Sequence, residues 1–205
     1  MSPAEPRLLP DACDPRLELG VLDLVHEAGN PYYDWLFGDP ELARLALRQL
    51  LATPSSELWR GRIRPLVEHG LLLGVILTLP GADLKRCRLA DSLALMAFAD
   101  GNATLDREEL TERMRASSPL FPVADPSDYV LSKIAVSSEH RGRGLGRRLL
   151  EAALGDASTH EFCRVRLEVA AVNRPALRLY KATGFETVSV QTCDTLTYIT
   201  MTRRV

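Results

Sequence analysis

The stretch that decides the fold is Arg-Gly-Arg-Gly-Leu-Gly at residues 141–146. It lies between a strand-like run at 129–136 and an amphipathic segment at 145–154 that predicts a helix. Alternate glycines leave room for a phosphate to approach the backbone, and the first turn of a helix offers free N–H groups and a positive dipole end. Four cations surround the same point: Arg141, Arg143, Arg147 and Arg148. The stretch therefore predicts a pyrophosphate site.

The spacing of the glycines narrows the kind of site. A dinucleotide fingerprint, G-x-G-x-x-G, would need a glycine where Arg147 stands. A Walker loop needs Gly-Lys-Ser/Thr, which does not occur in the sequence. The pattern that does fit is R-x-x-G-x-G, formed by Arg141, Gly144 and Gly146.

Two further motifs accompany this pattern at the expected distances. LSKIAV precedes it at 131–136, and Asn173 with RLYKATGF at 178–185 follows it. Together they resemble the GNAT acetyltransferase superfamily over about residues 129–186. The resemblance implies an α/β GNAT fold, with a mixed central sheet, helices on both faces and a cofactor site where the fourth and fifth strands splay apart. It implies acetyl-CoA as co-substrate.

The resemblance also implies which residues bind the cofactor. The fourth strand contributes main-chain groups, the loop contributes N–H groups and cations, and the cap of a later helix adds a contact. The implied residues are Ile134, Ala135, Val136, Arg141, Gly142, Arg143, Gly144, Leu145, Gly146, Arg147, Asn173 and Tyr180. Asn173 is also explained as a helix N-cap.

For catalysis, the resemblance implies that Tyr180 protonates the departing thiolate; its alternative role is that of a core aromatic. A general base must take the proton of the acceptor amine, and the candidates are Glu168, Asp128, and Glu68 or His69. Cys193 has no histidine near it in sequence, so we expect direct transfer. The four cysteines form no metal-binding cluster, and no metal is expected.

Composition favours one soluble domain spanning 1–205. A hydrophobic fraction of 46% is ordinary for globular proteins, and a net charge of −2 argues against a general nucleic-acid binder. The first residues have no continuous apolar run, and the apolar run at 71–79 is too short to span a bilayer. We expect a cytoplasmic protein with no membrane partner.

The N-terminal half predicts a short strand, two helices and a hairpin. The strand is expected at 7–9, the helices at 17–28 and 40–52, and the hairpin strands at 63–67 and 71–79. The segment 31–38, PYYDWLFG, is expected to be an aromatic loop. Its Tyr32, Tyr33 and Phe37 are candidate acceptor-binding residues.

Residues 80–128 depart from a minimal member of the superfamily. Helices are expected at 84–99 and 105–116, as an insertion before the fourth strand that shapes the acceptor site. Many acidic residues lie here, which would suit a cationic acceptor, although a solvated helix face explains most of them. After this insertion, two strands at 163–170 and 185–191, a helix at 174–183 between them, and a last strand at 195–202 complete the domain.

The expected reaction is acetyl transfer from acetyl-CoA to a primary amine through a ternary complex. We expect a small amine as acceptor, with a protein N-terminus or lysine as the alternative. A non-catalytic acyl-CoA-binding regulatory module is the alternative from another class. Edge strands of this fold also allow a homodimer.

Overall fold

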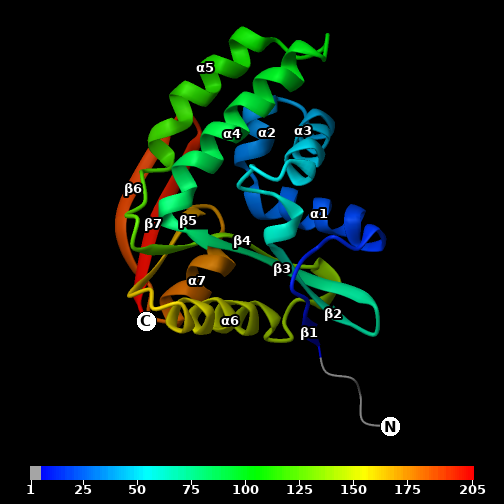
Figure 1. The fold of residues 1–205 in the computed structure, drawn as a ribbon. Helices are drawn as coiled ribbons and strands as arrows, with labels where there is room; N and C mark the ends of the chain where they lie inside the picture. The colour runs from blue at the N-terminus through cyan, green and yellow to red at the C-terminus, as the bar shows by residue number, and fades with distance from the viewer. Residues whose placement is uncertain (1–5) are drawn as a thin grey trace.

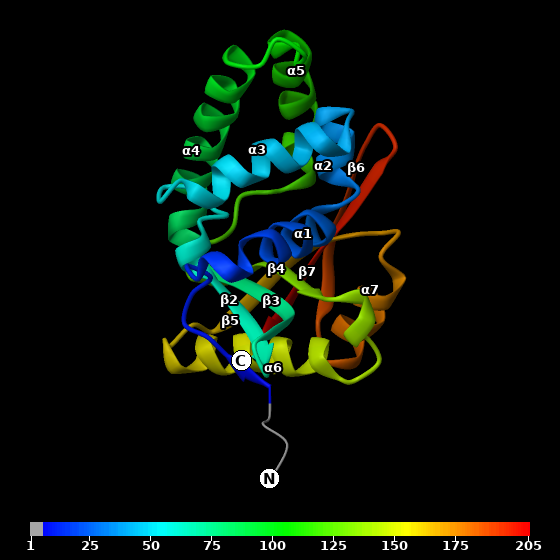
Figure 2. The ribbon, with the colours of Figure 1, turned by 90° about the vertical axis from the view of Figure 1, so that its right-hand side faces the viewer.

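The computed structural model describes residues 6–205, which form a seven-stranded sheet with helices on both faces (Figures 1 and 2). The strand order is β1-β2-β3-β4-β5-β7-β6. The strands are β1 (Arg7–Leu8), β2 (Ile63–Glu68), β3 (Leu71–Pro80), β4 (Asp128–Val136), β5 (Arg164–Ala170), β6 (Glu186–Cys193) and β7 (Leu196–Arg204). The mixed α/β fold predicted from the sequence is confirmed.

The β4–β5 pair is the one parallel pair of this sheet, and it is short. Asp128–Val130 pairs with Arg164–Arg166, and the pairing then ends. β4 continues to Val136 and β5 to Ala170, so the two strands separate over the rest of their length. This is the splay that the resemblance predicted, and it leaves backbone groups of both strands facing a gap.

The helices divide into two layers. In both views α1 to α5 lie on one face of the sheet, and α6 and α7 lie on the other (Figures 1 and 2). The helices are α1 (Glu18–Gly29), α2 (Tyr32–Phe37), α3 (Pro40–Ala52), α4 (Gly81–Asp100), α5 (Arg107–Ser117), α6 (Leu145–Thr159) and α7 (Arg174–Ala182). Short 3-10 turns are at Pro15–Leu17, Arg60–Arg62, Ser118–Leu120 and Ser138–His140. Each layer has its own hydrophobic core against the sheet.

The aromatic segment differs from the prediction, because it is the helix α2 and not a loop. Tyr33, Leu36 and Phe37 are buried, and their spacing of three and four places them on one helical face. Gly38, at φ 70°, ends the helix in the left-handed region that glycine adopts readily. The prediction was wrong because the segment begins with Pro31 and ends with Gly38, which are typical turn residues, and the helix between them has only six residues.

The two helices predicted between the third and fourth strands are confirmed as α4 and α5. Asp106 caps α5 by accepting hydrogen bonds from the N–H groups of Glu108 and Glu109. β3 and β4 still pair with each other along most of their length, so the helical hairpin projects from the sheet without breaking it. Among the described residues, no helix combines the length and the apolarity needed to cross a membrane.

Candidate active site

The glycine loop joins β4 to α6 and turns through two left-handed residues. Gly142 and Gly144 have φ values of 78° and 76°, which side chains with a Cβ rarely adopt. α6 begins directly after Gly144, and the N–H of Arg148 makes the first helical hydrogen bond to the Gly144 carbonyl. The preceding N–H groups, those of residues 145–147, are therefore free to bind an anion.

A cavity of about 540 Å³ opens in front of this loop, and we call it the glycine-loop cavity. It runs along the splay between β4 and β5 and is closed on its other sides by α1, α6 and α7. Of the residues predicted to bind the cofactor, eleven line it: Ile134, Ala135, Val136, Arg141, Gly142, Gly144, Leu145, Gly146, Arg147, Asn173 and Tyr180.

The arginines of the loop do not all converge. Arg141 and Arg147 line the cavity, and Arg141 pairs with Glu27 of α1 across its mouth. Arg143 is directed away, because its guanidinium pairs with Glu68 of β2 at 3.0 Å. Arg148 donates a hydrogen bond to the carbonyl of residue 6. The structure thus supplies two cations to the cavity where the sequence offered four.

One backbone edge of β4 is left without a partner strand along this cavity. On one side Ile134, Ala135 and Val136 pair with residues 74–76 of β3. On the other side they have no partner strand, because the pairing with β5 ended at Val130. At Gly146 a Cβ would make an ordinary van der Waals contact, 3.4 Å from Leu179 on the facing helix, so α6 and α7 pack closely beside this cavity.

Tyr180 projects from α7 into the same cavity. Its side chain is buried, and burial raises the pKa of its phenol well above 10. Within residues 6–205 no hydrogen-bond partner meets its hydroxyl, which is therefore available to a ligand in the cavity. Asn173 caps the helix that carries it, accepting from the N–H of Ala176 at 3.2 Å.

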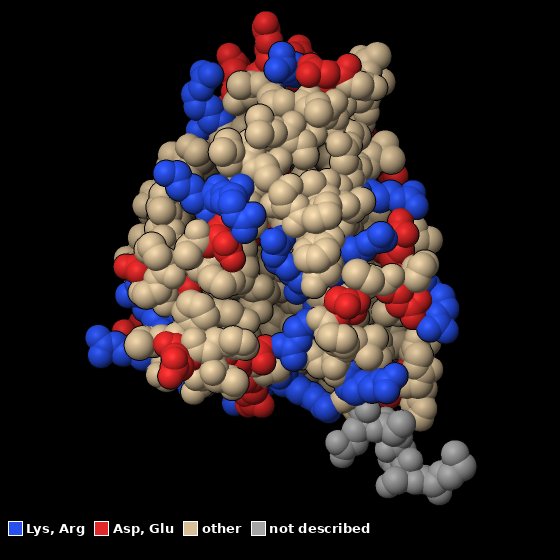
Figure 3. All heavy atoms as spheres, viewed as in Figure 1, with Lys and Arg blue, Asp and Glu red and all other residues tan. Residues whose placement is uncertain are grey.

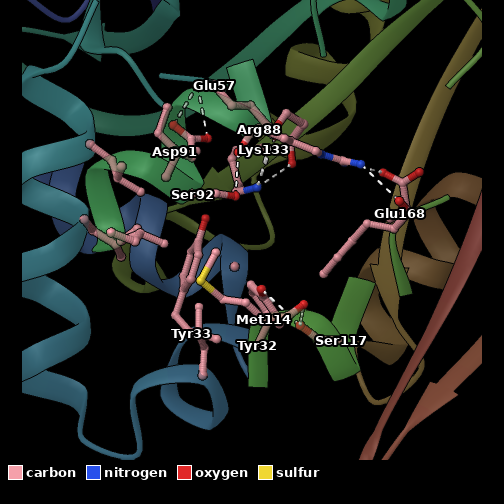
Figure 4. A pocket seen from close by; sticks show the side chains of 18 of the residues that line it. Tyr32, Tyr33, Glu57, Arg88, Asp91, Ser92, Met114, Ser117, Lys133 and Glu168 are labelled. Carbon is pink, nitrogen blue, oxygen red and sulfur yellow. Dashed lines mark hydrogen bonds and ion pairs between the residues drawn. The ribbon is translucent and has the colours of Figure 1, made fainter. Parts of the chain in front are cut away.

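A second cavity, of about 300 Å³, lies between the sheet and the helices α2 to α5, and we call it the helix-lined cavity. Figure 4 shows charged side chains along one side and aromatic and sulfur-containing side chains on the opposite side. The charged side chains are Glu57, Arg88, Asp91, Lys133 and Glu168. The apolar lining includes Tyr32, Tyr33, Leu36, Phe37, Leu47, Leu50, Leu95 and Met114.

The charged side chains form one network along their side of the cavity. Arg88 of α4 pairs with Glu57 at 3.2 Å and approaches Glu168 of β5 at 3.7 Å. Lys133 of β4 lies 4.0 Å from the Glu57 carboxylate, and Arg166 of β5 lies 2.9 Å from that of Glu168. Buried charges persist only when they are paired in this way.

Burial has the largest influence on the pKa values of two charged side chains that line this cavity, Asp91 and Lys133. It raises the pKa of Asp91 to about 6, although hydrogen bonds from Ser56 and from the Glu57 N–H oppose the rise. It lowers the pKa of Lys133, against the attraction of Glu57. For Glu57 itself, burial would raise the pKa, but Arg88 and Lys133 hold it below its ordinary value.

The two cavities meet where β4 and β5 separate. Four residues line both: Ala28, Ser132, Glu168 and Tyr198. Glu168 is the only acidic residue that they share among those described, and just 7% of its side chain is exposed. A molecule bound in one cavity can therefore contact a molecule bound in the other, next to the carboxylate of Glu168.

Comparison with known proteins agrees with this geometry. The model of the "Acetyltransferase (GNAT) family" matches residues 96–185. This part of the chain, 90 of its 205 residues, carries a GNAT acetyltransferase domain.

Two relatives are each similar to about a third of the chain. The [ribosomal protein bS18]-alanine N-acetyltransferase of Salmonella typhimurium is 35% identical over 39% of this chain and 53% of its own length. The N-alpha-acetyltransferase RimI of Mycobacterium tuberculosis is 39% identical over 32% of this chain and 40% of its own. The matches thus span about half of these relatives or less.

A solved N-acetyltransferase from Staphylococcus aureus Mu50 has the same fold over nearly the whole chain. Its TM-score is 0.70, with 18% sequence identity, and the match covers 96% of this chain and 100% of the other. The GNAT fold therefore extends beyond the part of the sequence that carries the family motifs.

Within the GNAT framework, the base candidates separate by position. Glu168 lies at the meeting point of the cavities, whereas Asp128 lines neither of them. The carboxylate of Asp128 is buried against Arg164 and accepts the N–H of Asp125 at 3.1 Å. Glu68 is paired with Arg143, and His69 is an exposed turn residue with a φ of 51°.

Of the aromatic candidates, Tyr32, Tyr33 and Phe37 all line the helix-lined cavity. The acidic residues of 80–128 mostly do not. Figure 3 shows acidic side chains at the far end of the α4–α5 hairpin, and of those in this segment Asp91 alone lines the cavity among the residues described. The abundance of acidic residues in this segment was therefore no guide to the acceptor.

Sequence reasoning missed Glu57, Arg88 and Lys133. Glu57 lies in a loop after α3, Arg88 lies mid-helix, and Lys133 sits within the LSKIAV motif that was valued for its backbone. One signal was present: a lysine in a strand of otherwise mainly apolar residues, which implies a buried partner of opposite charge.

Proposed function

We propose that this enzyme transfers an acetyl group from acetyl-CoA to the primary amine of a small acceptor, by direct attack in a ternary complex. The observation that carries the proposal is the meeting of two cavities at the splay, beside Glu168. One cavity has the anion-binding loop and free strand backbone suited to coenzyme A, and the other is walled by side chains suited to a small organic molecule.

Glu168 is proposed as the general base. Its carboxylate faces the point where an amine from the helix-lined cavity would meet the acetyl group, and it would accept the proton of the ammonium. Arg166 and Arg88 compensate the charge of this carboxylate in its buried position. The neutral amine then attacks the thioester carbonyl, forming the C–N bond.

The free edge of β4 and Tyr180 are proposed to serve the rest of the reaction. Backbone N–H groups of the splayed strand stabilise the oxyanion that develops on the carbonyl. When the C–S bond breaks, the Tyr180 hydroxyl donates its proton to the thiolate, and the proton that the new amide nitrogen loses restores the phenol. Its raised pKa keeps the phenol protonated and ready to donate at neutral pH.

The test is to incubate the protein with acetyl-CoA and a panel of primary amines, and to follow acetylated product and free CoA by mass spectrometry. We expect equimolar product and CoA, and no change in protein mass with acetyl-CoA alone. A covalently acetylated enzyme that then acetylates the amine would contradict direct transfer. CoA release without acetylated amine would contradict the proposed activity.

A protein N-terminus is the second candidate acceptor. It is favoured by the similarity to proteins named as N-alpha-acetyltransferases. The helix-lined cavity argues for the small amine, since residues of α2, α4 and α5 line it and its volume is about 300 Å³. A cytoplasmic location and a homodimer remain predictions of the sequence.

A further inference from the structure

We propose that the acceptor is a small primary amine with a single positive charge and an apolar body, of the arylalkyl or branched alkyl class. This inference rests on the proposed function and specifies its acceptor. Size, charge and the distribution of apolar surface in the helix-lined cavity each contribute to it.

The size of the cavity sets an upper limit on the acceptor. At about 300 Å³ it is at the lower end of the range for small-molecule sites. Tyr33, Leu36 and Phe37 are buried side chains that close it from the α2 side, and Leu47 closes it from α3. A monoamine of eight or so heavy atoms fits such a space, whereas a folded protein surface does not enter it.

The charges around the cavity disfavour any charge on the acceptor beyond that of its reacting amine. Three carboxylates and two cationic side chains line it, and a third cation, Arg166, pairs with Glu168, so positive and negative charges balance once Asp91 is ionised above pH 6. The ammonium group of a monoamine lies beside Glu168, which accepts its proton. A second charged group would add an unbalanced charge to a buried site of low dielectric, which is costly.

The same network disfavours a second charge on the acceptor. Arg88 and Lys133 occupy the side next to Glu57, and they would repel a second ammonium group. They are already paired with carboxylates, so an additional carboxylate on the acceptor would face Glu57 and Asp91 nearby. Diamines, basic peptides and amino acids are therefore poor acceptors.

The apolar wall lies opposite the charged side, as Figure 4 shows. Tyr32, Tyr33 and Met114 provide aromatic and thioether surface there, to which Leu95 contributes from α4. Burying an apolar body against this wall contributes roughly 25 cal/mol for each Å² removed from water. The body of the acceptor thus points into the helices, and its amine points to the splay.

Matched pairs of acceptors test the inference. With acetyl-CoA saturating, we expect kcat/KM for 2-phenylethylamine to exceed that for phenylalanine, and that for pentylamine to exceed that for 1,5-diaminopentane, each at least tenfold. A short peptide with a free N-terminus should be no better than phenylalanine. Equal or better turnover of the diamine, the amino acid or the peptide would overturn the inference while leaving the proposed activity intact. No transfer to any amine would overturn both.

A cavity-filling variant supplies a second test. Met114→Trp places a larger ring in the helix-lined cavity, and the expected result is a tenfold or greater rise in KM for 2-phenylethylamine with the KM for acetyl-CoA unchanged. The matched control is Arg115→Trp, at the exposed neighbouring position of α5, which should leave both unchanged. Titration of the amine into the CoA complex by calorimetry gives the same comparison without turnover. An unchanged amine affinity in Met114→Trp would contradict the assigned cavity.

Discussion

The two cavities that meet at the splay are built in opposite ways. The glycine-loop cavity draws most of its lining from one contiguous part of the chain, β4 to α7, with a few residues added from the C-terminal end of α1 and from β7. Its anion-binding groups are largely backbone N–H groups. The helix-lined cavity draws side chains from α2, α3, α4, α5, β4, β5 and the loop after α3. Chemistry common to many relatives can be fixed by a local motif, whereas acceptor choice depends on side chains that the fold brings together from distant segments.

The largest expected effect is on the binding of acetyl-CoA in the glycine-loop cavity. Gly144→Glu forces a side chain into the left-handed region and places an anion at the start of α6, where the pyrophosphate would lie. Repulsion between like charges at close range costs about 4 kcal/mol at a protein surface, so the affinity for acetyl-CoA should fall about 1,000-fold. The measurement is the shift of Tm that acetyl-CoA produces.

The control for this variant is Gly155→Glu, at an exposed position later in the same helix with open space around it. It should keep the full ligand-induced shift. If Gly144→Glu also kept that shift, the glycine loop would not be the phosphate site.

The next effect concerns Glu168, the acidic residue among the four described residues that line both cavities. Glu168→Gln preserves size and hydrogen bonding to Arg166 but removes the base, so kcat should fall about 100-fold with little change in acetyl-CoA affinity. Steady-state kinetics at saturating acetyl-CoA measures it. Glu186→Gln, on the exposed face of β6, is the matched control. A normal kcat in Glu168→Gln would assign the proton transfer to another group.

Asp91, which lines the helix-lined cavity, should make the stability of the protein depend on pH. The pKa of Asp91 is about 6 in the folded state, above the ordinary 3.8, so the folded protein binds this proton more tightly. The stability that the proton provides is present below pH 4 and is lost as the pH rises to about 6, about 3 kcal/mol in total and roughly half of it above pH 5.

Asp91→Asn removes the stability contribution that depends on protonation of Asp91. The free energy of unfolding of the variant, relative to the original protein, should improve by roughly 1.5 kcal/mol between pH 5 and pH 8. Denaturant titrations of both proteins at these two pH values measure it. A relative stability that does not change with pH would show that Asp91 ionises normally and that the helix-lined cavity is wetter than its walls imply.

The smallest expected effect is on the protonation of the departing thiolate by Tyr180. Tyr180→Phe should lower kcat about tenfold, since a thiolate with a reference pKa near 8.5 departs with only modest help from an acid. Tyr129→Phe is the control, because the hydroxyl of Tyr129 is bonded to Thr78 at 2.8 Å outside both cavities. Equal kcat values for the two variants would make Tyr180 a packing residue.

The same contrast explains what could be predicted from the sequence. The order from β4 to α7, the splay and the residues around the glycine loop followed from local motifs and from the resemblance they carry. Arg143 was expected in the cavity and lies elsewhere, because its neighbour in space is Glu68, 75 residues away along the chain. A cluster of arginines in sequence does not determine which of them find other partners.

The acceptor side was predictable only in part. The aromatic residues of α2 were correctly expected near the acceptor side, although their helix was predicted to be a loop. A cluster of aromatic residues indicates an apolar wall whether the segment is a loop or a helix. Glu57, Arg88 and Lys133 were not foreseen, because each pairs with a residue 31 or more positions away along the chain, which leaves no local pattern. Alternation along β5 could not decide whether Glu168 faced solvent or the splay.

The most direct test of the central claim is calorimetric titration of the protein with acetyl-CoA, ATP and NAD. We predict that acetyl-CoA binds at one site per chain and that neither ATP nor NAD displaces it at comparable concentration. A folded protein that does not bind acetyl-CoA, or that binds ATP or NAD in its place, would contradict the assignment of the glycine-loop cavity.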